Sequence, residues 1–200
     1  MIDNTHRMQR TVFHLALFFF GAVLSGCSGS LFKVKPAVEL PSLPASARSA
    51  NAGGLGLRVG RRLSDEESQE LFEANLPLSG VLAVRLELNF ETGGVPLELK
   101  RARFHLRDSA GHEWKLLPPK KAIARILKAN EIFLYNPNSR KQFEKDFTAY
   151  AVDLKSPLTA SEHRQGFVFF QTPDKGSVQS SSGLTLSITG LPQPLEIQID

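Results

Sequence analysis

The residue with the most distinctive chemistry in this chain is Cys27, the only cysteine among its 200 residues. A thiolate can act as a nucleophile, a metal ligand or a site of covalent modification. Cys27 ends the run Leu24-Ser25-Gly26-Cys27, directly after an apolar stretch and before a segment of small residues. A spare thiol is a liability in the oxidising compartments to which proteins are exported. The position of Cys27 therefore favours covalent modification near the N-terminus over catalysis.

The residues before Cys27 have the layout of an export signal. Arg7 and Arg10 form a basic region, and the apolar stretch Val12–Leu24 follows it. As a helix, this stretch is about 20 Å long, whereas the hydrocarbon core of a bilayer is about 30 Å thick. We therefore predict that residues 1–26 are a signal peptide, with Met8 as an alternative start. An uncleaved anchor helix and an ordinary secretory signal are the other interpretations.

The run Leu24-Ser25-Gly26-Cys27 resembles the lipobox of bacterial lipoproteins, which are cleaved by signal peptidase II. The resemblance implies cleavage before Cys27 and lipid, including palmitate-type acyl chains, on its sulfur and amino group. Several acyl chains hold a protein on a membrane far more firmly than one chain does. Ser28 follows the cysteine, and in Gram-negative lipoproteins such a residue implies sorting to the periplasmic face of the outer membrane.

Few other residues are candidates for catalysis or metal binding. The histidines after Cys27 are His105, His112 and His163, and they lack the close spacing of metal ligands. Asp153 and Glu162 are acid/base candidates, for which a solvated loop is the simpler interpretation. We therefore expect no cofactor, no metal and no enzymatic activity.

A group of arginines is the strongest binding signal in the sequence. Arg85, Arg101, Arg103 and Arg107 lie on or beside the polar faces of two successive predicted strands. If these strands pair, the guanidinium groups form a face that suits lipid phosphates or an acidic partner protein. A solvated face that keeps the protein soluble is the alternative. We expect no nucleic acid partner, because the predicted compartment holds none.

Composition divides the remainder of the chain in two. Residues 27–60 combine prolines, a Ser/Ala-rich patch and glycines, which predicts the lipidated cysteine followed by a flexible linker. Such a linker has a root-mean-square reach of about 30 Å. Residues 61–200 have the apolar periodicity of a folded domain, and the whole chain has a mild net charge of +4. No second apolar stretch is long enough to span a membrane.

The predicted domain is mainly β. A capping box at Ser64-Asp65-Glu66-Glu67 predicts a short helix, and period-two alternation predicts strands with turns between them. The strand over 84–90 is expected to have one wet face. The predicted strands cover residues 84–90, 102–106, 114–117, 132–135, 166–171, 184–189 and 195–199, and two further helices cover 120–130 and 139–150. This pattern predicts an antiparallel, immunoglobulin-like β-sandwich with short helical insertions.

The strand order, together with the phrase Gly166-Phe167-Val168-Phe169-Phe170-Gln171-Thr172-Pro173, resembles the telokin-like immunoglobulin-type domains of many bacterial lipoproteins. This fold hosts many functions and implies none by itself. We therefore expect a lipid-anchored envelope protein with a noncatalytic module that binds another envelope protein or anionic lipid. An assembly accessory of a secretion or transport complex is the first alternative, and a metal-assisted hydrolase is the second.

Overall fold

The computed structural model describes residues 34–91, 95–178 and 182–199, which belong to one compact unit. The predicted signal peptide and the lipobox residues Leu24, Ser25, Gly26 and Cys27 lie outside the described residues. Within these ranges, every helix is too short or too polar to cross a membrane.

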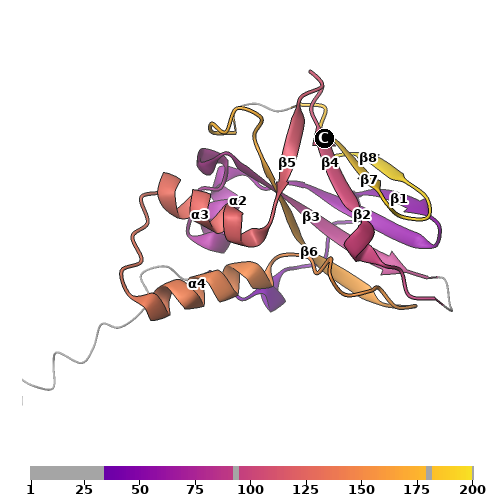
Figure 1. The fold of residues 1–200 in the computed structure, drawn as a ribbon, viewed down its shortest axis with the longest axis horizontal. Coiled ribbons are helices and arrows are strands. Elements are labelled where there is room, and N and C mark those ends of the chain that lie inside the picture. Colours follow the sequence, from indigo (N-terminus) through magenta and orange to yellow (C-terminus); the bar gives the residue numbers. More distant parts are fainter. Residues whose placement is uncertain (1–33, 92–94, 179–181, 200) are drawn as a thin grey trace, which may run out of the picture. The chain divides into compact units, whose positions relative to one another are not determined.

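The strands form an antiparallel β-sandwich, as the sequence predicts (Figure 1). The hydrogen-bonded order is β1-β2-β3-β6-β5-β4-β7-β8, and the two end strands, β1 and β8, lie close to each other. The strands are β1 (Arg48–Ala52), β2 (Leu55–Arg62), β3 (Val81–Phe90), β4 (Arg103–Arg107), β5 (Glu113–Leu117), β6 (His163–Gln171), β7 (Thr185–Thr189) and β8 (Leu195–Gln198). β4 and β5 are paired over two positions only, and this short junction connects the five-stranded layer to the layer of β4, β7 and β8.

The two layers enclose one apolar core. Alternate side chains of each strand point inward, so that Leu57, Leu86, Leu106 and Leu186 are fully buried in a single cluster. Burial of one such side chain contributes about 1.5–3 kcal/mol. The period-two spacing in the sequence therefore reports the inner face of the sandwich.

Helices cover the outer face of β3 and β6, on the side opposite to β7 and β8 (Figure 1). They are α2 (Asp65–Phe72), α3 (Pro119–Ala129) and α4 (Pro137–Ala149), with short 3₁₀ turns η2 (Ala37–Glu39), η3 (Pro77–Ser79) and η4 (Leu99–Arg101). α2 begins with the predicted capping box, in which the Glu67 N–H donates to Ser64 Oγ at 3.2 Å. Phe72 and Phe169 both pack on Phe147, with ring centroids 4.8 and 4.9 Å apart.

The predicted linker is folded over much of its length. β1 and most of β2 lie within residues 27–60, so the flexible-linker prediction is wrong for residues 48–60 and the predicted domain start at residue 61 is too late. Leu55, Leu57 and Val59 alternate with glycine and arginine, and they are only 2, 0 and 1 % exposed. Glycines and prolines nearby mask this alternation in the sequence. The described fold begins at Val34, which packs in the same cluster as Phe72.

The face of β3 that was predicted to contact solvent is covered by another segment of the chain. Arg85 and Glu87 are 8 and 2 % exposed, because residues 41–44, here called the strap, cross over them. The Leu43 N–H donates to Glu87 Oε1 at 2.7 Å, and Arg58 Nη1 donates to Glu87 Oε2 at 2.6 Å. Arg85 donates to the Pro41 carbonyl and, at 2.8 Å, to Gln165 Oε1. These polar side chains therefore fasten the strap to the sheet.

The predicted short strand over 132–135 is absent from the structure, which has the connection between α3 and α4 there. Ile132 is buried against the helices, and its N–H donates to the Leu127 carbonyl at 2.9 Å. The short apolar run over 132–135 therefore belongs to a loop that is anchored by Ile132 and Leu134.

Candidate binding site

The structure separates the four arginines of the predicted basic face. β6 and β5 lie between β3 and β4, so Arg85 on β3 is not adjacent to the arginines of β4. Arg85 is also buried under the strap, and the prediction that it belongs to an exposed binding face is wrong. Arg101, Arg103 and Arg107 are exposed along η4 and β4. The chain crosses to the other layer after β3, and strand parity alone does not reveal this crossover.

The three histidines lie apart, and His105 and His112 each contact a different carboxylate. His105 Nδ1 lies 2.9 Å from Glu113 Oε1, between β4 and β5, and His112 Nδ1 lies 3.1 Å from Asp108 Oδ2 in the turn that follows β4. His163 is exposed at the start of β6. Across residues 34–91, 95–178 and 182–199, no three histidine, cysteine or acidic side chains gather as a metal site would require.

The acids Asp153 and Glu162 fasten a loop. Hydrogen bonds from the Thr159 backbone N–H and from Arg164 lower the pKa of Glu162 to about 2. The Ser156 side chain and the Lys155 backbone N–H lower the pKa of Asp153. Arg164 Nη1 donates to the Asp153 carbonyl at 2.7 Å and to the Ser156 carbonyl at 2.9 Å. Both carboxylates are therefore ionised at neutral pH and fix the 153–162 loop in place.

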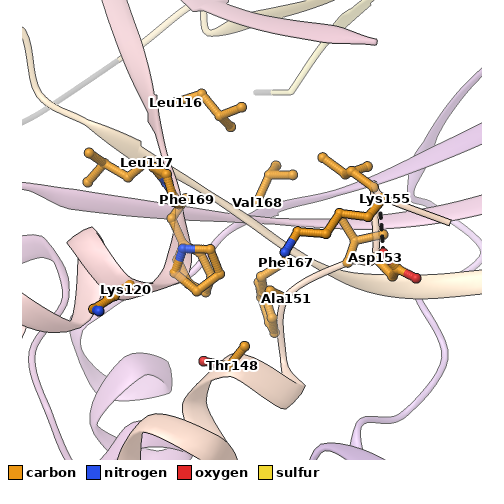
Figure 2. Close-up of a pocket in the computed structure, with 14 residues that line it drawn as sticks. Leu116, Leu117, Lys120, Thr148, Ala151, Asp153, Lys155, Phe167, Val168 and Phe169 are labelled. Atoms are coloured by element: carbon orange, nitrogen blue, oxygen red, sulfur yellow. Dashed lines mark hydrogen bonds between the residues drawn. The ribbon is translucent and has the colours of Figure 1, made fainter. Parts of the chain in front are cut away.

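An apolar pocket of about 580 Å³ lies where β5 leaves the edge of β6 (Figure 2). The last residue pair between these strands is Leu117 with Phe169, and Pro118 and Pro119 then turn the chain into α3. The next backbone hydrogen bond along this edge of β6 is at Phe167, whose N–H donates to the Tyr150 carbonyl at 2.7 Å. The pocket occupies the interval between these two pairings.

A close backbone approach fixes one wall of this pocket. A Cβ atom on Gly166 would lie 2.5 Å from the Val152 nitrogen and 2.7 Å from its Cα. Only glycine lets the 151–155 segment cross β6 at this distance. Figure 2 shows Ala151, Asp153 and Lys155 on this segment, facing the pocket across from Leu117.

Two lysines flank the apolar walls of the pocket. Lys120 lies at the start of α3, and Lys155 extends from the 151–155 segment toward the middle of the pocket (Figure 2). Neither amine has a hydrogen-bond or ion-pair partner among the residues that the structure describes. Asp153 also lines the pocket, but its Oδ1 accepts from the Lys155 backbone N–H at 2.8 Å. The pocket therefore suits an apolar group that ends in, or lies beside, a negative charge.

A second opening, here called the β4–β5 gap, adjoins the pocket. Beyond the pair of Leu106 with Trp114, β4 keeps only β7 as a partner and β5 keeps only β6. The gap measures about 520 Å³ and is bounded by Ala102, Arg103, Phe104, His105, Glu113, Trp114, Lys115 and Leu116. Leu116 lines both the gap and the apolar pocket.

Sequence reasoning missed both openings, although it contained one signal. Pro118-Pro119 predicts that a strand ends there, and it does. The pocket wall opposite the end of β5 is formed by residues 151–155, which lie more than thirty positions later in the chain. The lining residues therefore come together through tertiary contacts that no local pattern reports.

Comparisons with known proteins identify no family for this chain. No family model matches it, and no curated protein matches it. Among solved structures, it is similar to MPT63, a secreted protein from Mycobacterium tuberculosis, with 14% sequence identity and a TM-score of 0.39. The match covers 82% of this chain and 96% of that one. A likeness at this level says nothing about what this chain binds.

Proposed function

We propose that this chain is a lipid-anchored envelope protein whose folded unit is a noncatalytic binding module. The module takes an extended segment of another envelope protein at the β4–β5 gap, with an apolar side chain of that segment in the apolar pocket. The observation that carries the proposal is the divergence of β4 and β5, which leaves each strand with one unpaired edge beside the pocket.

The anchor part of the proposal rests on the sequence. Cys27 follows Leu24-Ser25-Gly26 at the end of an apolar stretch that is too short to span a bilayer comfortably. A lipid on Cys27 holds the module on a membrane face, and Ser28 favours the periplasmic face of the outer membrane in a Gram-negative cell. The partner is then another component of the same envelope.

The geometry supports recognition by strand addition. An extended segment beside β4 or β5 supplies the backbone donors and acceptors that these edges lack. Its side chains alternate between two faces, so every second one can point toward Leu116 and the apolar pocket. Arg103 and Lys115 border the gap, and Lys120 and Lys155 border the pocket. We therefore expect the bound segment to be apolar and acidic.

Site-specific photocrosslinking in intact cells tests the proposal. A photoreactive amino acid replaces Lys115 in the gap, and the control position is Lys121, an exposed residue on α3 that lines neither opening. We expect a discrete adduct with one envelope protein from position 115 and none from position 121. Mass spectrometry of the adduct then locates the bound segment, and a synthetic peptide of that sequence is titrated against the purified protein.

Charge reversal distinguishes this site from a general attraction to a basic surface. The Lys120→Glu, Lys155→Glu double variant should weaken peptide binding by at least about tenfold, since each charge-assisted contact contributes about 1.5–3 kcal/mol. Lys121→Glu should leave the affinity unchanged. Equal adducts at positions 115 and 121, or an equal loss of affinity in both charge variants, would show that the gap is not the binding site.

A further inference from the structure

Two aromatic rings stand exposed in the connection between α3 and α4. The side chains of Phe133 and Tyr135 are 67 and 88 % exposed, and their rings stack with centroids 6.0 Å apart. Leu134, which lies between them in the sequence, is partly buried. Ile132, which precedes them, is only 7 % exposed, so the connection is anchored to the helices. The connection, which joins α3 to α4 (Figure 1), therefore has two large exposed rings on an anchored backbone.

Basic residues outnumber acidic ones in the sequence around this aromatic pair. Residues 128–145 contain four basic and two acidic side chains. Arg140 is paired with Glu144 at 3.0 Å, whereas Lys128, Lys141 and Lys145 are exposed and have no partner in the described part of the chain. Lys141 and Lys145 are one turn apart on α4 and therefore share one face.

The described part of the chain begins on the side of the molecule that the helices cover, here called the helical side. Val34 and Ile132 belong to one buried cluster, and the Tyr150 hydroxyl at the end of α4 donates to the Lys35 carbonyl. Only six residues lie between Cys27 and Val34. The seven steps from one Cα atom to the next along this stretch span at most about 25 Å even when fully extended. A lipid on Cys27 therefore keeps the helical side of the module close to the bilayer surface.

We infer that the α3–α4 connection is a membrane-contact surface, at which Phe133 and Tyr135 enter the headgroup region of an anionic bilayer and Lys128, Lys141 and Lys145 bind its phosphates. This inference rests on the proposed lipid anchor at Cys27. Tyr135 suits the membrane interface, because its ring is apolar at one end and polar at the other. Phe133 adds an apolar ring of the kind that interfacial segments bury at the boundary between headgroups and acyl chains. Each lysine beside an anionic bilayer raises the binding constant about fivefold.

The contact fixes the orientation of the module. With the α3–α4 connection on the bilayer, the layer of β4, β7 and β8 lies on the opposite side of β3 and β6 and faces away from the lipid. The surface is thus distinct from the β4–β5 gap and from its proposed protein partner.

Fluorescence quenching by brominated phospholipid tests the inference on the full-length protein with its native N-terminus. The protein is purified from its host in detergent and reconstituted into phosphatidylcholine vesicles with or without phosphatidylglycerol. Phe133→Trp places the probe on the surface, and Val95→Trp is the matched control, since Val95 is 82 % exposed in the connection between β3 and η4. The native Trp114 is buried at 5 % exposure and gives a common background.

We expect brominated lipid to quench the Phe133→Trp probe severalfold more than the Val95→Trp probe, and only when phosphatidylglycerol is present. Adding Lys141→Glu and Lys145→Glu should return the quenching at position 133 to the level at position 95. Equal quenching of the two probes, or quenching that is indifferent to both phosphatidylglycerol and the lysines, overturns the inference. Vesicle flotation and the mass of the N-terminal peptide report the anchor at Cys27 separately, so a missing anchor is distinguished from a missing contact.

Discussion

The carboxylate of Glu87 shows how a single polar residue can hold a long segment in place. It lies on β3, is 2 % exposed, and accepts hydrogen bonds from the Leu43 N–H at 2.7 Å and from Arg58 at 2.6 Å. Arg58 also donates to the Leu43 and Pro44 carbonyls, at 3.1 and 2.7 Å. Together with the hydrogen bond from Arg85 to the Pro41 carbonyl, the strap therefore depends on one carboxylate and two guanidinium groups.

We predict that Glu87→Ala lowers the free energy of unfolding by about 3 kcal/mol, because it leaves the Leu43 N–H and the Arg58 guanidinium without their partner. Urea denaturation of the purified protein measures this change. Glu91→Ala is the control, since Glu91 is exposed just after the same strand, and its effect should stay within about 0.5 kcal/mol. Equal effects of the two substitutions would contradict the role of Glu87 in holding the strap.

Glu162 gives the 153–162 loop a defined dependence on pH. Its pKa is lowered from 4.5 to about 2, mainly by the Thr159 N–H and by Arg164, so folding favours the ionised form. The stabilisation is complete above pH 4.5 and is lost as the pH falls through about 2. We predict that the hydrogen-exchange protection of the Thr159 amide, corrected for intrinsic rates, falls over this window. Glu162→Gln should remove the Glu162 part of this dependence, while Asp153 retains its own.

An unchanged pH profile in Glu162→Gln would show that another group controls the loop. The second group to examine is Asp153, whose pKa is lowered by the Ser156 side chain and the Lys155 N–H. Because Asp153 and Lys155 line the apolar pocket, the same experiment reports on the wall of the proposed binding site.

At the scale of elements, sequence patterns were reliable where the cause of an element is local. The capping box at Ser64 predicted the start of α2, since its hydrogen bonds span only three residues. The predicted strand over 166–171 is β6, whose unbroken apolar run is typical of a strand covered on both faces, and Phe167 and Phe170 are 1 and 0 % exposed on opposite faces. A local turn at 108–111 joins β4 to β5, with Asp108 accepting from the Ala110 and His112 N–H groups.

The patterns failed where an element depends on distant residues. Arg85 has the strand parity of an exposed side chain, but the strap that covers it lies about forty positions earlier in the chain. β2 was hidden because Gly56 and Gly60 lower its apparent strand propensity, although Leu55, Leu57 and Val59 supply its buried face. The lining of the apolar pocket was likewise beyond local prediction, since the end of β5 meets the 151–155 segment only in the folded chain.

At the scale of the whole molecule, the short stretch of chain between Cys27 and the described fold leaves little room for the predicted flexible linker. The sequence predicted a linker of more than thirty residues, which would lift a freely moving domain from the membrane. The structure describes folded chain from Val34 onward, which leaves six positions after Cys27 for any linker. If Cys27 carries the proposed lipid, so short a connection would restrict the orientation of the module relative to the bilayer.

The same finding predicts where the chain can be cut. A fragment of residues 34–200 should unfold cooperatively, whereas a fragment of residues 61–200, which matches the domain start predicted from sequence, should not fold. The shorter fragment lacks β1 and most of β2, including Leu55, Leu57 and Val59, which are 2, 0 and 1 % exposed in the core.

Burial of each of these three side chains contributes about 1.5–3 kcal/mol, so their joint loss approaches the 5–15 kcal/mol by which a typical domain is stable. β3 would also lose its neighbour on one edge and the Arg58 partner of its buried Glu87. Thermal unfolding monitored by circular dichroism, together with the dispersion of amide proton shifts, distinguishes the two fragments. Cooperative unfolding of the 61–200 fragment would mean that β1, β2 and the strap are accessories to a self-sufficient domain.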